Sequence, residues 1–336
     1  MKAMGSPLCE QLQPASAMGG LLGASAAMQE VFRLIERVGP TEASVLLTGE
    51  SGSGKELAAH CIHACSAQRD GPFVAINCGA IPAGLIEAEL FGHERGSFTG
   101  AVRAHTGVFE RAQGGTLLLD EVTEMPVGLQ TRLLRVLESR KFYRVGASVE
   151  LCADVRVIAA TNRCPLQAVQ NGQLREDLLY RLAVFPINLP PLRDRGDDIE
   201  LLAAHFLAEL NARAGTRKRL SALARMTLKQ HGWPGNVREL KNCIERAFIL
   251  GEESLDLAPL IQRNPSDRRG DGAGGPERLD IRVGSRIDDM ERSLIEATLD
   301  YYQGNKRRAA DALGCSLKTL YNKLNGYSQN PECANS

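Results

Sequence analysis

The sequence lacks several features that would assign it to a class of protein at once. Its 336 residues carry 40 basic and 40 acidic side chains, so the formal net charge is zero and bulk charge indicates no partner. It contains no run of eighteen apolar residues, and no basic segment followed by an apolar one opens the chain. We therefore expect a cytoplasmic protein that is neither secreted nor membrane-spanning, and any surface for nucleic acid must be local.

Cysteine is present, but it is not grouped. None of the nine cysteines forms a Cys-x-x-Cys pair, and no His-x-x-x-His completes a zinc site, so free thiols in a reducing compartment are the expected state. No internal repeat is visible. The hydrophobic share of 43% and charged share of 24% are ordinary for a globular protein, and the length allows two or three domains.

Short apolar runs alternate with helical patterns between residues 21 and 190. Each run has four to six residues, is rich in valine, isoleucine and leucine, and ends at polar residues or glycine, as buried parallel strands do. The alternation predicts an α/β fold in which helices flank a parallel sheet. The five runs are residues 44–48, 73–77, 116–119, 155–160 and 184–187.

After Leu189-Pro-Pro-Leu192 the strand pattern stops and helical patterns remain. One helix is predicted to be capped by Asp197 or Asp198, and another opens at Asn236 with Glu239 three residues on, the spacing of a capping box. The predicted divisions are a tail (1–20), the α/β subdomain (21–190), a helical subdomain (191–263), a linker (264–283), a small helical domain (284–327) and a second tail (328–336).

A glycine-rich turn follows the first predicted strand directly and opens a helix. Glycines at 49, 52 and 54 would let backbone N–H groups face phosphate oxygens, and Lys55 would reach the β- and γ-phosphates. A P-loop usually continues with Ser or Thr, whereas Glu56 stands here, and a chance glycine-rich turn is the alternative. The predicted nucleotide-binding residues are Gly49, Glu50, Ser51, Gly52, Ser53, Gly54, Lys55 and Glu56.

The third predicted strand ends in two carboxylates, Asp120 and Glu121. At the carboxyl edge of the sheet Asp120 would hold magnesium, directly or through water, and Glu121 would align or activate the attacking water. The alternative is a buried strand that ends in acidic turn residues. Together with the P-loop pattern, the pair predicts ATP and Mg²⁺ as ligands, and hydrolysis as well as binding.

Residues 89–103 form a glycine-broken stretch between helical patterns. Phe98 and Thr99 lie at its tip, with Gly96 and Gly100 on either side. An aromatic ring on such a loop has little to pack against in its own domain, so it suits a partner's surface. The alternative is a ring that folds back on the core.

The run Gly96-Ser-Phe-Thr-Gly-Ala101 resembles the GAFTGA signature of bacterial enhancer-binding proteins, the AAA+ activators of sigma-54 RNA polymerase. Ser97 stands where alanine is usual, and Glu56 matches a glutamate that this family carries. The resemblance spans residues 21–251 and 287–327. In the family the loop touches sigma-54 and ATP hydrolysis moves it. The implied sigma-54 contacts are Gly96, Ser97, Phe98, Thr99, Gly100 and Ala101.

The resemblance also implies roles around the nucleotide. Asn77 matches the residue that restrains the catalytic glutamate, Asn162 matches sensor I, and Arg238 matches sensor II. Arg175 and Arg181 match arginine fingers that enter the neighbouring subunit's site, although an arginine in a helix is more often a solvated or ion-paired surface residue. A guanidinium from a neighbour contributes roughly 10³–10⁵ in rate, so hydrolysis would depend on a ring, expected to be hexameric.

The segment from 284 to 327 predicts three helices, with Asn305 and Ser316 as N-caps and Gly314 in a left-handed turn. The predicted apolar stripes are Ile287, Met290 or Glu291, Leu294, Thr298 and Tyr301 in the first helix, and Leu317, Leu320, Tyr321 and Leu324 in the last.

Five basic residues stand against one acidic residue between 303 and 326, as a phosphate-contacting surface requires. The segment resembles a Fis-type helix-turn-helix; the alternative is a small dimerisation or capping domain with a basic face. If two subunits bind DNA as a pair, their two DNA half-sites would lie roughly 34–36 Å apart. The predicted DNA contacts are Lys306, Arg307, Arg308, Ser316, Lys318, Thr319, Asn322 and Lys323.

These observations together predict an ATP-hydrolysing activator that binds enhancer DNA and remodels closed complexes of the sigma-54 RNA polymerase holoenzyme into open ones. Two rivals stay open: another AAA+ remodelling ATPase, and a ligand-sensing DNA-binding repressor with an AAA+ fold. Because the tail at 1–20 is too short for a receiver domain, we expect control by a separate regulatory protein, a co-activator subunit or expression level.

Overall fold

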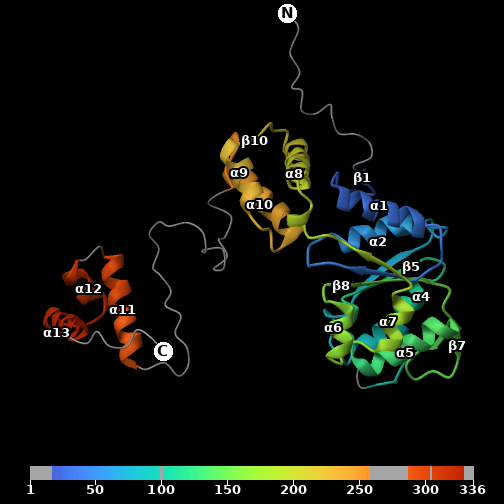
Figure 1. Cartoon of the computed structure of the whole chain (residues 1–336). Helices are drawn as coiled ribbons and strands as arrows, with labels where there is room; N and C mark the ends of the chain where they lie inside the picture. Colours follow the sequence, from blue (N-terminus) through green and yellow to red (C-terminus); the bar gives the residue numbers. More distant parts are fainter. Residues whose placement is uncertain (1–16, 99–100, 258–286, 303–304, 329–336) are drawn as a thin grey trace, which may run out of the picture. The chain divides into compact units, whose positions relative to one another are not determined.

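The computed structural model describes residues 17–98, 101–257, 287–302 and 305–328 (Figure 1). The chain divides into two compact units, Met1–Gln262 and Arg263–Ser336. The predicted linker at 264–283 lies outside the described residues. None of the helices in the described ranges is both long enough and apolar enough to cross a membrane.

A five-stranded parallel sheet forms the centre of the first unit, in the order β4-β5-β8-β3-β9. All five predicted runs are strands of this sheet, which confirms the α/β fold class. Three of them end one residue later than predicted, so that Asp120 is the last residue of β5, Thr161 that of β8 and Asn188 that of β9. The strands are β3 (Val45–Thr48), β4 (Phe73–Asn77), β5 (Thr116–Asp120), β8 (Arg156–Thr161) and β9 (Phe185–Asn188).

Helices cover both faces of the sheet (Figure 1). Alternate residues of β5 point to opposite faces, so Leu118 belongs to one core and Leu117 and Leu119 to the other. Helices α1 (Ala26–Val38) and α2 (Lys55–Ala64) pack on the first face. The other face carries α3 (Ile86–Phe91), α4 (Val108–Arg111), α5 (Val127–Ser139), α6 (Pro165–Gln170) and α7 (Glu176–Leu182).

Three short elements complete this α/β part. They are the 3₁₀ turn η2 (Val122–Glu124) and two antiparallel pairs, β1 (Ala17–Met18) with β2 (Leu21–Leu22) and β6 (Lys141–Tyr143) with β7 (Glu150–Cys152). Neither pair was predicted from the sequence, and β1 lies within the predicted tail at 1–20.

The helical subdomain that follows, called the lid below, has its own core around the fully buried Trp233. A parallel pair of two-residue strands joins the loop after its first helix to its end. Its elements are η3 (Leu192–Asp194), α8 (Asp198–Ala214), β10 (Arg219–Leu220), α9 (Ala222–Gln230), α10 (Asn236–Leu250) and β11 (Ser254–Leu255).

The side-chain caps predicted at the starts of α8 and α10 are wrong, although Asp197 stands at the N-cap position and α10 begins at Asn236 as predicted. Asp197 occupies the N-cap of α8 without a side-chain bond, and Asp198 turns away to bind the start of α1. Its carboxylate accepts from the N–H groups of Ala24 (2.6 Å) and Ser25 (2.9 Å) and from the Ser25 hydroxyl (2.7 Å). A buried carboxylate takes the donors that satisfy it best, and these lie 173 and 174 positions away in the sequence.

The second error concerns the start of α10. Gly235, not Asn236, is its N-cap, and the Asn236 side chain bonds to other segments of the unit. The other half of the predicted capping box is present, because the Glu239 carboxylate accepts from the Gly235 N–H at 2.8 Å.

The second unit consists of α11 (Ile287–Tyr301), α12 (Lys306–Ala312) and α13 (Leu317–Ser328). Its predicted turn chemistry is confirmed. The Asn305 side chain accepts from the Arg308 N–H at 3.2 Å, the Ser316 hydroxyl accepts from the Thr319 N–H at 3.1 Å, and Gly314 has a φ of +66°.

The predicted apolar stripes of this unit are partly wrong. The buried residues are Ile295, Ala309, Ala310 and Leu320, with Leu299 and Leu324 packed against them, whereas Leu294, Leu317 and Tyr321 are exposed. In α11 the buried face begins one residue later than predicted, because this helix carries apolar residues on two adjacent faces. The side chains of Ile287, Met290 and Tyr301 lie outside the described ones.

Candidate nucleotide site, loop and DNA-contact surface

The predicted P-loop runs from the end of β3 into the first turn of α2, with Gly54 at the N-cap in a left-handed conformation (φ +106°). Lys55 is buried, and its Nζ donates to the carbonyls of Gly49 (2.9 Å) and Glu50 (3.3 Å). Burial lowers the pKa of Lys55, while the charges of Glu121 and Asp120 oppose that shift. The ammonium therefore lies over its own loop, within the field of the acidic pair.

Two polar side chains of the P-loop, those of Glu56 and Ser53, differ in their exposure to solvent. Glu56 is exposed in the first turn of α2, where a negative charge suits the helix dipole. Ser53 is 1% exposed, and its hydroxyl has no hydrogen-bond partner among the described residues. A buried hydroxyl without a partner beside a helix N-terminus is suited to an anionic ligand.

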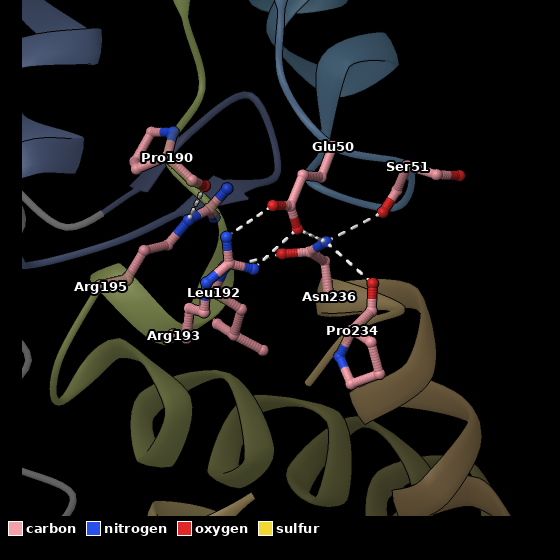
Figure 2. Close-up of polar contacts among 8 residues, drawn as sticks. All are labelled: Glu50, Ser51, Pro190, Leu192, Arg193, Arg195, Pro234 and Asn236. Carbon is pink, nitrogen blue, oxygen red and sulfur yellow. Dashed lines mark hydrogen bonds and ion pairs between the residues drawn. The ribbon is translucent and has the colours of Figure 1, made fainter. Parts of the chain in front are cut away.

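A buried arginine that was not predicted from the sequence supports the backbone of the P-loop. Arg195 is 1% exposed and donates to the Ser53 carbonyl at 2.6 Å. It also donates to the Pro190 carbonyl at 2.9 Å (Figure 2). Burial lowers its pKa to about 10. The one available signal was its place directly after the last strand, where two prolines and a charged cluster mark the change to the lid.

The acidic edge is assembled as the parallel strands predict. Asn77 and Asp120 are register partners at the ends of β4 and β5, and the Asn77 amide donates to the Asp120 carboxylate at 3.2 Å. Glu121 has a φ of +51°, and its carboxylate accepts from the Asn162 N–H at 3.3 Å. The sheet thus brings Asn77, Asp120, Glu121 and Asn162 to one edge.

One predicted contact at this edge is corrected. The family resemblance led us to expect the Asn77 amide to restrain Glu121, but in this structure it binds Asp120. The other end of the amide is fixed, since its oxygen accepts from the N–H groups of Gly79 (2.9 Å) and Ala80 (3.0 Å). Because the amide oxygen is held by that turn, the amide nitrogen is the group left to bind the Asp120 carboxylate.

The two predicted arginine fingers are exposed and bind within their own chain. Arg175 pairs with Asp177 at 2.6 Å, and the hydrogen bond to Asp177 raises the pKa of Arg175. Arg181 donates to the Leu137 carbonyl at 2.8 Å. The predicted sensor II residue, Arg238, reaches the loop itself, donating to the Ser51 hydroxyl at 3.2 Å.

The glycine-broken loop has a fixed base. His93 and His105 pair through their backbones at 3.0 and 2.9 Å, and Glu94 donates to the Val145 carbonyl at 3.0 Å. Arg144 joins the two sides, because its guanidinium binds Glu94 (3.0 Å) and both carboxylate oxygens of Glu110 (2.9 and 2.6 Å).

At the tip of this loop the expectation for Phe98 needs correction. Its ring makes an edge contact with the His93 ring at 4.9 Å between centroids and is half-buried, so it does have a packing partner. Ser97 lies against Gly146, where an added Cβ would approach the Ser97 Cβ to 2.7 Å. Gly96 is exposed and Ala101 is buried, while Thr99 and Gly100 lie outside the described residues.

The predicted DNA contacts in the second unit are mostly on its surface. The exposed residues are Lys306, Arg307, Arg308, Ser316, Lys318, Thr319 and Asn322. Several of the eight predicted residues are nevertheless engaged within the unit, and the Ser316 and Thr319 hydroxyls hydrogen-bond to each other at 2.7 Å. Lys306 lies over the Tyr321 ring at 4.6 Å, and the half-buried Lys323 forms an ion pair with Glu291 at 2.5 Å, which corrects its predicted outward position.

Three family models match the chain. The Sigma-54 interaction domain matches residues 21–188, the AAA+ ATPase lid domain residues 193–270, and the bacterial regulatory protein, Fis family, residues 286–327.

Relatives include the nitrogen fixation protein VnfA of Azotobacter vinelandii, 45% identical over 97% of this chain, and the transcriptional regulatory protein FlbD of Caulobacter vibrioides, 46% identical over 90%. The chain spans 61% of the length of VnfA and 69% of that of FlbD. Among solved structures, NtrX from Brucella abortus in complex with ATP is 34% identical, with a TM-score of 0.70 over 93% of this chain and 70% of NtrX. The chain therefore belongs to the family of sigma-54-dependent transcriptional activators, with an AAA+ ATPase domain and a Fis-type helix-turn-helix.

Proposed function

We propose that this protein binds and hydrolyses ATP and uses the resulting motion to remodel closed complexes of the sigma-54 RNA polymerase holoenzyme into open ones. The proposal rests on two features of one compact unit. The first is a P-loop beside a strand that ends in acidic residues. The second is the Gly-Ser-Phe-Thr-Gly-Ala loop, whose base is held by the hydrogen bonds of Arg144. A helicase or clamp loader needs the first feature but not the second.

Residues 49–56 would hold the phosphates through backbone N–H groups at the start of α2. Lys55 is suited to this, because its ammonium now binds only loop carbonyls and can turn to a phosphate at little cost. The unpartnered hydroxyl of Ser53 supports the same ligand. NtrX was solved with ATP and with ADP, and its 34–35% identity to this chain supports a shared nucleotide site.

The residues present also fit Mg²⁺. No group of three or more His, Cys, Asp or Glu side chains that could hold a metal occurs in the described part of the chain, and magnesium in such enzymes needs only one or two carboxylates plus substrate phosphates. Asp120 would hold it, and the bound ion would neutralise charge on the phosphates. Glu121 would accept the proton of the attacking water, with its carboxylate oriented by the Asn162 N–H.

Hydrolysis would require neighbouring copies of the chain. In a ring, expected to be hexameric, Arg175 and Arg181 would exchange their present partners for the neighbour's phosphates; both are exposed and so accessible to another subunit. Arg238 would report the nucleotide state to the lid through its contact with Ser51. The Phe98 and Thr99 tip would contact sigma-54, and the second unit would bind enhancer DNA through Lys318, Thr319 and their exposed neighbours.

The loop assignment is tested with Phe98→Ala, using Val102→Ala as the matched control because Val102 is 75% exposed in the same stretch. We expect Phe98→Ala to retain ATPase activity and lose sigma-54-dependent open-complex formation, and Val102→Ala to retain both. Unchanged sigma-54-dependent transcription by Phe98→Ala would reject this loop as the sigma-54 contact.

The nucleotide site is tested with Lys55→Ala, which should abolish ATP binding. Normal ATPase activity in that variant would reject the P-loop assignment. Control of the protein is tested by the purified chain alone: transcription activated without any added protein would point to regulation by expression level, and dependence on an added factor would point to a separate regulator or co-activator.

A further inference from the structure

The turn Trp233-Pro-Gly-Asn236 of the lid lies directly against the P-loop. The Val237 N–H donates to the Gly52 carbonyl at 3.1 Å, and a Cβ added to Gly52 would lie 2.4 Å from the Gly235 carbonyl oxygen. The two backbones thus meet without room for a side chain between them.

Asn236 makes the central side-chain contacts of this junction (Figure 2). It is fully buried, and its Oδ1 accepts from the Leu192 N–H at 2.7 Å. Its Nδ2 donates to the Glu50 carboxylate and to the Ser51 carbonyl, both at 3.1 Å. One amide therefore joins the P-loop, the start of η3 and the start of α10.

The backbone of the turn holds this amide in place. Asn236 has a φ of +53° and Trp233 a φ of +47°, and positive φ is unusual for a residue as bulky as tryptophan. Trp233 is buried, with its Nε1 bonded to the Leu228 carbonyl at 2.9 Å. Such strained backbone persists only where the surroundings determine it and is concentrated at functional sites.

Glu50 is the P-loop residue whose side chain accepts hydrogen bonds from the lid. Arg193 donates to both of its carboxylate oxygens at 2.6 and 2.9 Å, and Asn236 donates to one of them (Figure 2). These hydrogen bonds, that of Arg193 first, lower the pKa of Glu50, so the carboxylate is ionised at neutral pH.

We propose that Asn236 is a positioning residue that fixes the Glu50-Ser51-Gly52 backbone in its phosphate-binding conformation, so that nucleotide affinity depends on the lid turn. The inference rests on the proposed nucleotide site and adds a residue to it. A cap role does not account for the contacts, because the Asn236 side chain bonds to residues up to 186 positions away and to none of the first N–H groups of α10.

Asn236→Asp separates this role from general packing. The aspartate is nearly the same size and keeps an oxygen for the Leu192 N–H, but it replaces the Nδ2 donor with an oxygen that faces the Glu50 carboxylate. Glu50→Gln, combined with it, restores a hydrogen bond of reversed polarity, since the glutamine amide donates to Asp.

Asn236→Gly keeps the positive φ and removes the side chain. Lys229→Gln, which breaks an ion pair with Glu200 within the lid, is the matched control.

The dissociation constant of a fluorescent ADP analogue, with KM and kcat for ATP, is measured for each full-length variant. We expect Asn236→Asp and Asn236→Gly to weaken binding by about tenfold or more, the size expected for the loss of a hydrogen bond to a charged group. KM should rise more than kcat falls. Adding Glu50→Gln should recover a large part of the affinity in the Asp variant and none in the Gly variant.

The inference is overturned if either Asn236 variant binds nucleotide as the unaltered chain does, or if Glu50→Gln fails to rescue Asn236→Asp. A poorly folded Asp variant leaves the Gly variant as the decisive measurement, because glycine accepts the backbone angle without strain. If the unaltered chain and Lys229→Gln bind no nucleotide either, the proposed function fails before the positioning role is reached.

Discussion

Replacing Arg144 with methionine should loosen the base of the glycine-broken loop at 89–103, the proposed sigma-54 contact, and leave the nucleotide site intact. The Arg144 side chain is 26% exposed and binds Glu110, which is 19% exposed, and Glu94, which is 42% exposed. Methionine keeps the length of the side chain and removes the charge. It leaves the Glu110 carboxylate, the less exposed of the two, without its guanidinium partner.

The expected loss of stability follows from this partial burial. Hydrogen bonds to charged groups contribute about 1.5–3 kcal/mol when buried, and exposed ion pairs about 0.2–1 kcal/mol. For a pair between these limits we expect about 1–3 kcal/mol, which in a unit of this size lowers Tm by about 2–12 °C. Open-complex formation should fall more than ATPase activity, because the guanidinium holds the loop's flanks and touches no P-loop residue.

The effect should also depend on pH. Arg144 holds the pKa of the Glu110 carboxyl below its ordinary value, so the pair stabilises the fold above that value and loses its contribution as the pH falls through the lowered pKa. The difference in Tm between Arg144→Met and the unaltered chain should therefore be largest near pH 7 and shrink as the pH falls below the ordinary carboxyl pKa of 4.5. Arg111→Met, at an exposed residue of α4 with no ion pair in the described structure, is the control. Equal Tm values for Arg144→Met and Arg111→Met at pH 7 would refute the reasoning.

Further predictions concern the thiols, the DNA surface and the lid junction. A thiol-alkylating reagent at pH 8 should modify the exposed Cys152 and spare Cys78, whose pKa burial raises to about 12, as peptide mass mapping would show. Lys318→Ala should weaken DNA binding and lower the salt slope of the affinity by about 1, and Lys323→Ala should change that slope less, as binding titrations at several salt concentrations would test. Gly52→Ala should abolish ATP binding in an equilibrium titration, because the added Cβ meets the lid backbone at a φ of +76°. Tight ATP binding by this variant would contradict the close approach of lid and P-loop.

The central sheet could be predicted from the sequence because its strands are buried on both faces. Such strands are continuous apolar runs, and the polar residues after them mark the carboxyl edge, so this pattern predicts the position of Asp120, whereas that of Asn162 was implied by the family resemblance. The second pair of short strands was missed for the opposite reason. Lys141–Tyr143 and Glu150–Cys152 are three residues each and largely exposed, which leaves no apolar pattern to detect.

Polar residues that act over long sequence distances could not be predicted. The pattern around Asp198 and Asn236 is that of a helix start, and both residues do stand at the starts of helices. Their side chains nevertheless bond to partners more than 170 positions away, where burial makes a satisfied hydrogen bond worth more than a cap. Only the tertiary fold brings those partners within reach.

The Asp198 contact has a practical consequence for anyone who divides the gene. A cut at the predicted boundary near residue 190 would remove the carboxylate that receives the Ala24 and Ser25 N–H groups, and would leave Asp198 without its three donors in the other fragment. In both fragments the polar groups at that point would lack their hydrogen-bond partners. Expression fragments that begin before Gly23 and continue through the whole lid should fold, whereas shorter ones should be prone to aggregation and proteolysis.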